Sequence, residues 1–199
     1  MSEAASPVEL AEHVAATARG LNIETALIGA SALAVHGYVR GTSDIDLASM
    51  VDPYTELPRL QQALEADGFK TKLNFPDADD DLGGLLRVWK AAADDGDPIE
   101  PVDVVNLLNP HRPLRLPARA MITDAVRIDE HSSLRCVTLP HLILLKLYAG
   151  ARRDLADVVA VLEENPDVDT EALRLLCKQY GHTEIDILIA EANAPRERR

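Results

Sequence analysis

The stretch from Ile28 to Leu47 constrains the fold more than any other part of this 199-residue chain. It begins with an apolar run that ends at Gly29, which is typical of a buried strand followed by a tight turn. Ser31 then predicts the N-cap of a short helix that ends at Gly37. The backbone N–H groups at such a helix start, beside the small residue Ala30, form a site that phosphate oxygens can approach.

Asp44 and Asp46 follow on what we expect to be a second strand. Residues i and i+2 of a strand point to the same face, with Cα atoms about 7 Å apart, so Ile45 and Leu47 would face the core. Two carboxylates beside a phosphate-binding turn repel one another unless a cation lies between them. Carboxylates and phosphates are preferred ligands of Mg²⁺, and paired metal ions about 3.5–4 Å apart serve in-line phosphoryl displacement. A solvated loop is the alternative for an isolated Asp-x-Asp pair, but its place after the turn and helix favours a metal–nucleotide site.

The stretch resembles the signature of the polymerase-β-type nucleotidyltransferases, and the matching residues are Gly29-Ala30-Ser31-Ala32-Leu33, His36-Gly37, Arg40, Thr42 and Asp44-Ile45-Asp46-Leu47. More narrowly, it is similar to the AbiEii-like nucleotidyltransferases, the toxins of some bacterial toxin–antitoxin systems. The resemblance implies that Asp44 and Asp46 are catalytic and bind metal. It also implies a group of nucleotide-binding residues: Gly29, Ala30, Ser31, Arg40 and Thr42. Taken alone, Arg40 would pair with Asp44, and Thr42 would cap the turn.

A third acid, Asp103, lies within residues 100–108, whose apolar pairs predict a buried strand. A carboxylate in apolar surroundings is costly unless it has a partner. Nucleotidyltransferases carry a third acid on a neighbouring strand, so the resemblance makes Asp103 the third catalytic and metal-binding candidate. It would act either as a metal ligand or as the general base that takes the acceptor proton. The alternative is a strand-end aspartate bound to nearby backbone N–H groups.

Lys146 is a single cation within an apolar run of Leu and Ile, so its ammonium group needs a partner, and a triphosphate is one candidate. The segment from Lys146 to Asp157 resembles the C-terminal motif of the AbiEii-like group, in which a lysine and a Lys/Arg–Asp pair line the nucleotide pocket. This implies that Lys146 contacts phosphates and that Asp154 orients Lys146 or an arginine. From spacing alone, Asp157 would pair with Arg153 on one helix face. A salt-bridged helix–turn–helix is the alternative for the whole group.

We therefore expect an α/β (α+β) fold, with a nucleotidyltransferase-type mixed β-sheet and helices. The catalytic core would span residues 7–110, and a mainly helical region, residues 111–195, would close the cleft. Three prolines, at positions 110, 113 and 117, mark the boundary and predict an irregular segment there. The apolar fraction of 47% is sufficient for a packed core. Cys136 and Cys177 lack metal-ligand spacing and are expected to be small core residues.

The net charge of −13 argues against a broad nucleic-acid-binding surface, although it leaves room for a local basic groove. No apolar run reaches the roughly 20 residues of a membrane span. The first residues lack the basic and apolar stretches of a signal peptide. We accordingly expect a cytoplasmic protein without a membrane partner.

The predicted reaction moves a nucleoside monophosphate from a nucleoside triphosphate to an acceptor hydroxyl group, with Mg²⁺ as cofactor. The resemblance implies a toxin that modifies tRNA or another cellular target and has an antitoxin protein as partner. A small-molecule acceptor is one alternative: an antibiotic of the aminoglycoside or lincosamide type, of which the cationic aminoglycoside suits an acidic protein. A second alternative is a non-catalytic module that binds a nucleotide or a partner protein on the same scaffold.

Overall fold

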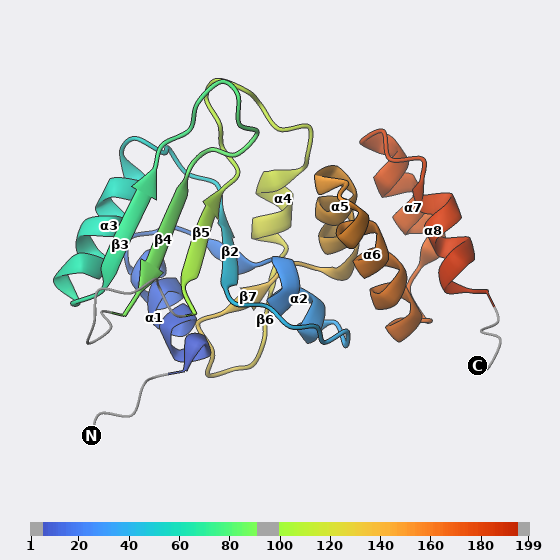
Figure 1. Cartoon of the computed structure of the whole chain (residues 1–199), viewed down its shortest axis with the longest axis horizontal. Coiled ribbons are helices and arrows are strands. Elements are labelled where there is room, and N and C mark those ends of the chain that lie inside the picture. Colours follow the sequence, from blue (N-terminus) through green and yellow to red (C-terminus); the bar gives the residue numbers. More distant parts are fainter. Residues whose placement is uncertain (1–5, 91–99, 195–199) are drawn as a thin grey trace.

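The computed structural model describes residues 6–90 and 100–194, and this part of the chain forms one seven-stranded sheet in the order β3-β4-β5-β2-β1-β7-β6 (Figure 1). The strands are β1 Thr25–Leu27, β2 Ile45–Ser49, β3 Lys70–Asn74, β4 Leu85–Trp89, β5 Val102–Asn106, β6 Val126–Arg127 and β7 Arg135–Cys136. The helices are α1 Pro7–Gly20, α2 Gly29–Val35, α3 Glu56–Ala66, α4 Ala118–Thr123, α5 Leu139–Ala149, α6 Arg152–Glu164, α7 Thr170–Gln179 and α8 Ile185–Ala192. The expected mixed α/β fold is confirmed, because β2 pairs with β5 and β1 with β7 in parallel while the remaining pairs are antiparallel.

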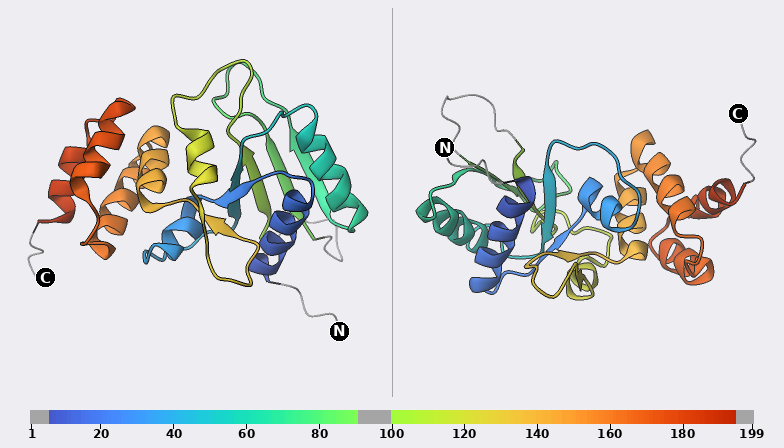
Figure 2. Two further views of the ribbon diagram at one scale, coloured as in Figure 1. Left: turned by 180° about the vertical axis from the view of Figure 1, so that it is seen from behind. Right: turned by 90° about the horizontal axis from the view of Figure 1, so that it is seen from below.

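The two faces of the sheet are covered differently. Leu47 and Val104 face the main core, where α1 packs against β2 and β5, and α3 packs against β3 and β4 (Figure 2, left). The alternate residues face the other way, because successive side chains of a strand point to opposite faces. On that second face, Ala48 belongs to a smaller cluster with Ala118 and Ile122 of α4. The acidic residues of β2 and β5 lie on this second face as well.

Local signals account for several helix boundaries. Ser6 and Glu9 form a reciprocal capping box at the start of α1, with Pro7 in the first helical position. The N-cap expected at Ser31 was wrong. The helix begins at Gly29 instead, after the N-cap residue Ile28, because Gly29 adopts a φ of +64° and turns the chain directly out of the strand segment.

Helix α4 was not expected, since the prolines around it indicated an irregular segment. Pro117 is its N-cap residue, a position where a missing backbone N–H group removes no helical hydrogen bond. The helix can therefore form directly after a proline that appeared to break it. Its buried side chains cover the second face of the sheet next to the acidic residues.

Residues 111–194 are mainly helical, and α5–α8 form the end of the molecule opposite α3 (Figure 1). Helix α5 packs against α2 and α6, which connects this helical group to the sheet. The same part of the chain also supplies β6 and β7, which continue the sheet beyond β1. A domain division at residue 110 stays a prediction. No helix within residues 6–90 and 100–194 is long and apolar enough to cross a membrane.

Candidate active site

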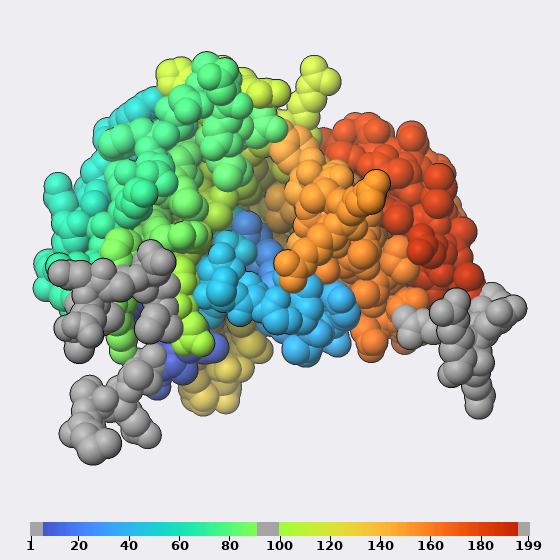
Figure 3. All heavy atoms as spheres, in the orientation of Figure 1, coloured from blue at the N-terminus to red at the C-terminus, as the bar shows by residue number. Residues whose placement is uncertain are grey.

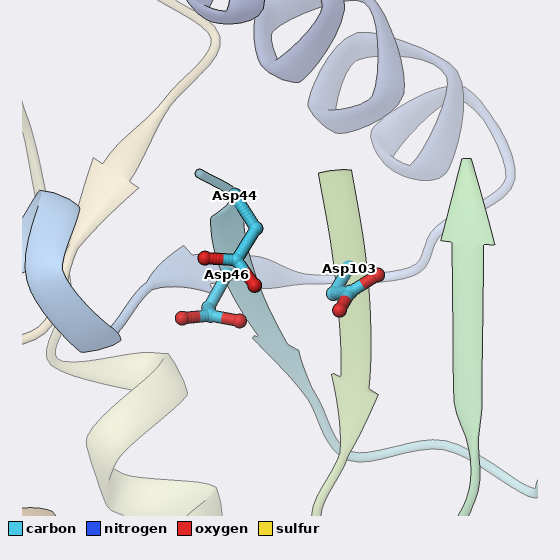
Figure 4. A group of neighbouring side chains, drawn as sticks. All are labelled: Asp44, Asp46 and Asp103. Atoms are coloured by element: carbon cyan, nitrogen blue, oxygen red, sulfur yellow. The ribbon is translucent and has the colours of Figure 1, made fainter. Parts of the chain in front are cut away.

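Three aspartates from two neighbouring strands converge on the second face of the sheet. Asp44 directly precedes β2, Asp46 is its second residue, and Asp103 is the second residue of β5. The parallel register of β2 and β5 pairs Asp46 directly with Asp103. Each of the three carboxylates offers an oxygen atom that lies within 4.8 Å of the other two (Figure 4). The chain therefore brings together the three acids that the sequence singled out.

Burial and mutual repulsion make this cluster electrostatically unfavourable by itself. Asp103 is only 5% exposed, and Asp44 and Asp46 are half-buried. Burial, together with the charges of Asp44 and Asp103, raises the pKa of Asp46 to about 6, although Lys146 and Arg40 oppose the shift. A divalent cation between the carboxylates would offset this cost, and three hard oxygen donors are a fitting ligand set for Mg²⁺. The donor set thus fits the expected metal.

One side-chain and one backbone hydrogen bond hold Asp44 and Asp46 in place. Thr42 Oγ1 donates a hydrogen bond to Asp44 Oδ1 at 2.7 Å, and the Ile28 N–H group donates to the Asp46 carbonyl oxygen at 3.0 Å. The carboxylate of Asp46 lies directly against Gly29. A Cβ atom on Gly29 would be 2.2 Å from Asp46 Oδ2, so any side chain at this position would displace the Asp46 carboxylate.

Asp103 has a partner that sequence reasoning missed. Arg87 on β4 stands directly opposite Asp103 in the antiparallel register. Its guanidinium group donates two hydrogen bonds, from Nε to Oδ1 at 2.8 Å and from Nη2 to Oδ2 at 2.6 Å. The hydrogen bond to Asp103 raises the pKa of Arg87 above its ordinary value. The available signal was a single arginine between the inward-facing residues Leu86 and Val88 of β4.

The cationic side chains come from α5, α6 and the segment before β2. Lys146 Nζ lies 2.7 Å from Asp154 Oδ1 and 2.9 Å from Asp157 Oδ2, and Arg40 Nε lies 3.0 Å from Asp157 Oδ1. The side chain of Lys146 is 9% exposed and that of Asp157 is 3% exposed. The expected contact between Lys146 and Asp154 is therefore present. Asp157 faces Lys146 and Arg40 rather than Arg153, because its side of α6 is turned inward.

A polar cleft of about 520 Å³ has both acids and cations in its lining, which comprises Gly29, Ala30, residues 40–44, Asp46, Lys146 and Arg153. Ser31 follows Ala30 in α2 and is not among the lining residues. An apolar cavity of about 190 Å³ adjoins the cleft, shares Gly29 and Lys146 with it, and extends toward Val105 and Leu107. Figure 3 shows the molecule hollowed between the blue-to-lime part of the chain and the orange helices. The arrangement can hold a cation on one wall and a polyanion on the other.

The sequence as a whole matches one protein family. The family model described as "Nucleotidyl transferase AbiEii toxin, Type IV TA system" covers residues 14–199. None of the curated proteins matches the chain.

Solved structures with similar folds share little sequence with this chain. An antigenic nucleotidyltransferase-like protein from Paracoccidioides brasiliensis is 16% identical, with 94% of this chain and 92% of that chain covered and a TM-score of 0.54. A Helicobacter pylori protein described as a nucleotidyltransferase is 18% identical, with 96% and 82% covered and a TM-score of 0.50. The antibiotic-resistance factor ANT(2'')-Ia is 21% identical, with 92% and 89% covered and a TM-score of 0.48. The first two likenesses agree with the fold described above.

Proposed function

Because the chain belongs to the AbiEii nucleotidyl transferase toxin family, we propose that it is a metal-dependent enzyme that transfers a nucleoside monophosphate from a nucleoside triphosphate to an acceptor hydroxyl group on tRNA. Its membership makes it a nucleotidyltransferase. The proposal for the metal and the site rests on one observation above all: three carboxylates lie within 4.8 Å of one another, and two of them, Asp44 and Asp46, line a cleft that Lys146 and Arg153 also line.

Asp44, Asp46 and Asp103 would hold Mg²⁺. Bound there, a divalent cation supplies charge neutralisation for the transferred phosphoryl group and for the departing pyrophosphate. The raised pKa of Asp46 supports this assignment, because burial first, and then repulsion from Asp44 and Asp103, disfavour its charged form in the absence of a cation. Asp103 would either complete the metal site or accept the proton of the acceptor hydroxyl group.

The opposite wall would receive the triphosphate. Arg40, Lys146 and Arg153 supply positive charge along the cleft, and Gly29 lets the backbone of Ala30 come close to the phosphates. Thr42 would keep Asp44 oriented through its hydrogen bond, and Asp154 would orient Lys146. In the transfer, the acceptor oxygen forms a bond to the α-phosphorus while the bond from that phosphorus to the pyrophosphate oxygen breaks. Positioning and charge stabilisation would account for most of the rate.

The surroundings of the acids favour a nucleic-acid acceptor. The cavity next to them is lined mainly by leucines and other apolar side chains, which suits a planar nucleobase better than a polycation. An RNA end that enters the cleft would meet its cations locally, in spite of the overall charge of −13. That net charge favours a second candidate acceptor, a cationic aminoglycoside.

The remaining parts of the proposal follow from the family. Its description as a type IV toxin–antitoxin member supports an antitoxin protein that counteracts the activity. Because nucleoside triphosphates and tRNA are found in the cytoplasm, we propose that the protein acts there.

A labelling experiment tests this proposal. The protein is incubated with Mg²⁺ and each α-labelled nucleoside triphosphate, and total tRNA, aminoglycosides and protein are offered in parallel as acceptors. Label in tRNA is expected, and it should disappear in Asp44→Asn and Asp46→Asn but persist in Asp79→Asn, which changes an exposed acid in a loop. Label in the aminoglycoside would support the second candidate. Full transfer by Asp44→Asn, or nucleotide binding that ignores Mg²⁺ with no transfer to any acceptor, would contradict the mechanism.

A further inference from the structure

The pair formed by Arg87 and Asp103 lies at the edge of the acidic cluster. Arg87 comes from β4, a strand that carries none of the three acids, and its side chain is 37% exposed while that of Asp103 is 6% exposed. The guanidinium group thus reaches a buried carboxylate from a more open position. Both oxygens of Asp103 accept hydrogen bonds from one planar fork, at 2.8 and 2.6 Å.

This geometry fixes the plane of the Asp103 carboxylate, which the backbone leaves free. Strand β5 sets the position of the Asp103 Cβ atom, but the plane of an aspartate carboxylate rotates broadly about its last side-chain torsion. A bidentate arginine selects one plane, since its two N–H groups match the two oxygens of a carboxylate. Each carboxylate oxygen has two lone pairs, so Asp103 retains acceptor capacity for a cation while it stays bound to Arg87.

We propose that Arg87 is a positioning residue of the transfer reaction, which holds the Asp103 carboxylate in the plane that presents an oxygen atom to the same point as Asp44 and Asp46. The inference rests on the proposed function, because that proposal gives Asp103 its role. Partners that orient the ligands of a metal in this way typically account for about 10- to 100-fold in metal affinity or activity.

A simpler role would be that of a counter-charge for a buried carboxylate. The two roles predict different results when the positive charge and the two-pronged guanidinium geometry are changed separately. Arg87→Lys keeps the positive charge and loses the fork. Arg87→Gln loses the charge and keeps an amide donor. A pure counter-charge predicts unchanged cation affinity for the lysine variant and tighter cation binding for the glutamine variant, because a nearby positive charge has been removed. A positioning residue predicts weaker cation binding in both variants.

The experiment measures Mn²⁺ binding to the full chain without nucleotide, by electron paramagnetic resonance of the free ion. We expect Arg87→Lys to weaken Mn²⁺ binding about tenfold, and by no more than Asp103→Asn does. The effect should vanish when Asp103→Asn is already present, because Arg87 acts through that carboxylate. Arg59→Lys is the matched control: Arg59 also forms an ion pair, with Glu56 on α3, and its change should alter Mn²⁺ affinity less than about twofold.

A second readout uses the transfer assay, in which Arg87→Lys should lower kcat about tenfold or more while KM for the nucleoside triphosphate changes less than about threefold. Thermal unfolding of each variant shows whether it is folded. If Arg87→Lys does not fold, Mn²⁺ binding by Arg87→Gln tests the proposal instead. Wild-type Mn²⁺ affinity in Arg87→Lys, or tighter binding in Arg87→Gln, would overturn the inference. If Asp103→Asn itself left Mn²⁺ binding unchanged, the metal-binding role proposed for Asp103 would fail, and the inference would fail with it.

Discussion

The carboxylate of Asp46 rests against the backbone of Gly29, so closely that a methyl group on Gly29 would lie 2.2 Å from Oδ2. Gly29 also has a φ of +64°, which side chains disfavour by about 1–2 kcal/mol. Gly29 thus ends the segment that follows β1, begins α2 and leaves the space in which the carboxylate of Asp46 lies.

We expect Gly29→Ala to reduce transfer by about 100-fold or more, because it must displace Asp46, and displacements of about 1 Å have effects of that size. Stability should fall by about 1–2 kcal/mol from backbone strain. The matched control is Gly20→Ala at the end of α1, where a Cβ atom meets nothing within 4 Å. Steady-state kinetics and urea denaturation of both variants provide the check. Unimpaired transfer by Gly29→Ala would show that Asp46 is not held by this contact.

The raised pKa of Asp46 predicts how stability depends on pH in the absence of metal. The carboxyl group titrates near 6 in the fold and near 3.9 in the unfolded chain, so between these values the native state binds more protons. The contribution of Asp46 therefore becomes unfavourable as pH rises from about 4 to 6, and amounts to about 3 kcal/mol above that range. Asp46→Asn should be more stable than the wild type at pH 7.5 in a chelator, but not at pH 4.

Urea denaturation at the two pH values measures this difference. Mg²⁺ should stabilise the wild type at pH 7.5 and have much less effect on Asp46→Asn, because the cation binds only the folded site. Asp79→Asn controls for the general effect of removing a negative charge. If Asp46→Asn were no more stable than the wild type at pH 7.5, the charged form of Asp46 would not destabilise the metal-free fold.

Lys146 is expected to matter for the fold as well as for phosphate binding. It contacts Asp154 and Asp157 in a largely buried network, so Lys146→Met would remove the cation beside Asp154 and leave Asp157 with Arg40 alone, at a cost of about 3 kcal/mol. Lys146→Arg keeps the charge and should be destabilised less. Chemical denaturation ranks the variants. Equal stability of the methionine variant and the wild type would mean that Lys146 does not stabilise the fold and acts only in phosphate binding.

The two cysteines should behave as reporters of unfolding. Cys136 and Cys177 are buried, and burial raises the pKa of each thiol to about 12. Because the thiolate is the reactive form, neither should react with a disulfide reagent at pH 8 while the protein is folded, and both should react in denaturing urea. The measurement is the number of thiols modified over time. Rapid modification with an unchanged circular dichroism spectrum would contradict the prediction.

The sequence predicted the elements whose signals are local. The strands expected around Asp44 and Asp46 and within residues 100–108 coincide with β2 and β5, because burial of a strand leaves its apolar pattern in the residues themselves. The meeting of Asp46 with Asp103 was anticipated only through the family resemblance. No pattern within either strand specifies that β2 and β5 lie side by side in parallel.

What escaped prediction depends on register and on tertiary packing. Arg87 meets Asp103 only because β4 and β5 pair in one particular register, and a slip of one residue would turn Arg87 to the opposite face. Asp157 appeared to be a surface partner of Arg153 until the packing of α6 turned it toward Lys146. Short-range spacing does not contain these relationships.

The order of the sheet also bears on when the enzyme can first act. Strand β5 lies between β4 and β2, so the third aspartate takes its place only after a late segment has inserted between two earlier ones. Synthesis proceeds from the N-terminus, and Lys146 is added later still. A partly synthesised chain on the ribosome therefore carries Asp44 and Asp46 before the third aspartate and Lys146 are in place.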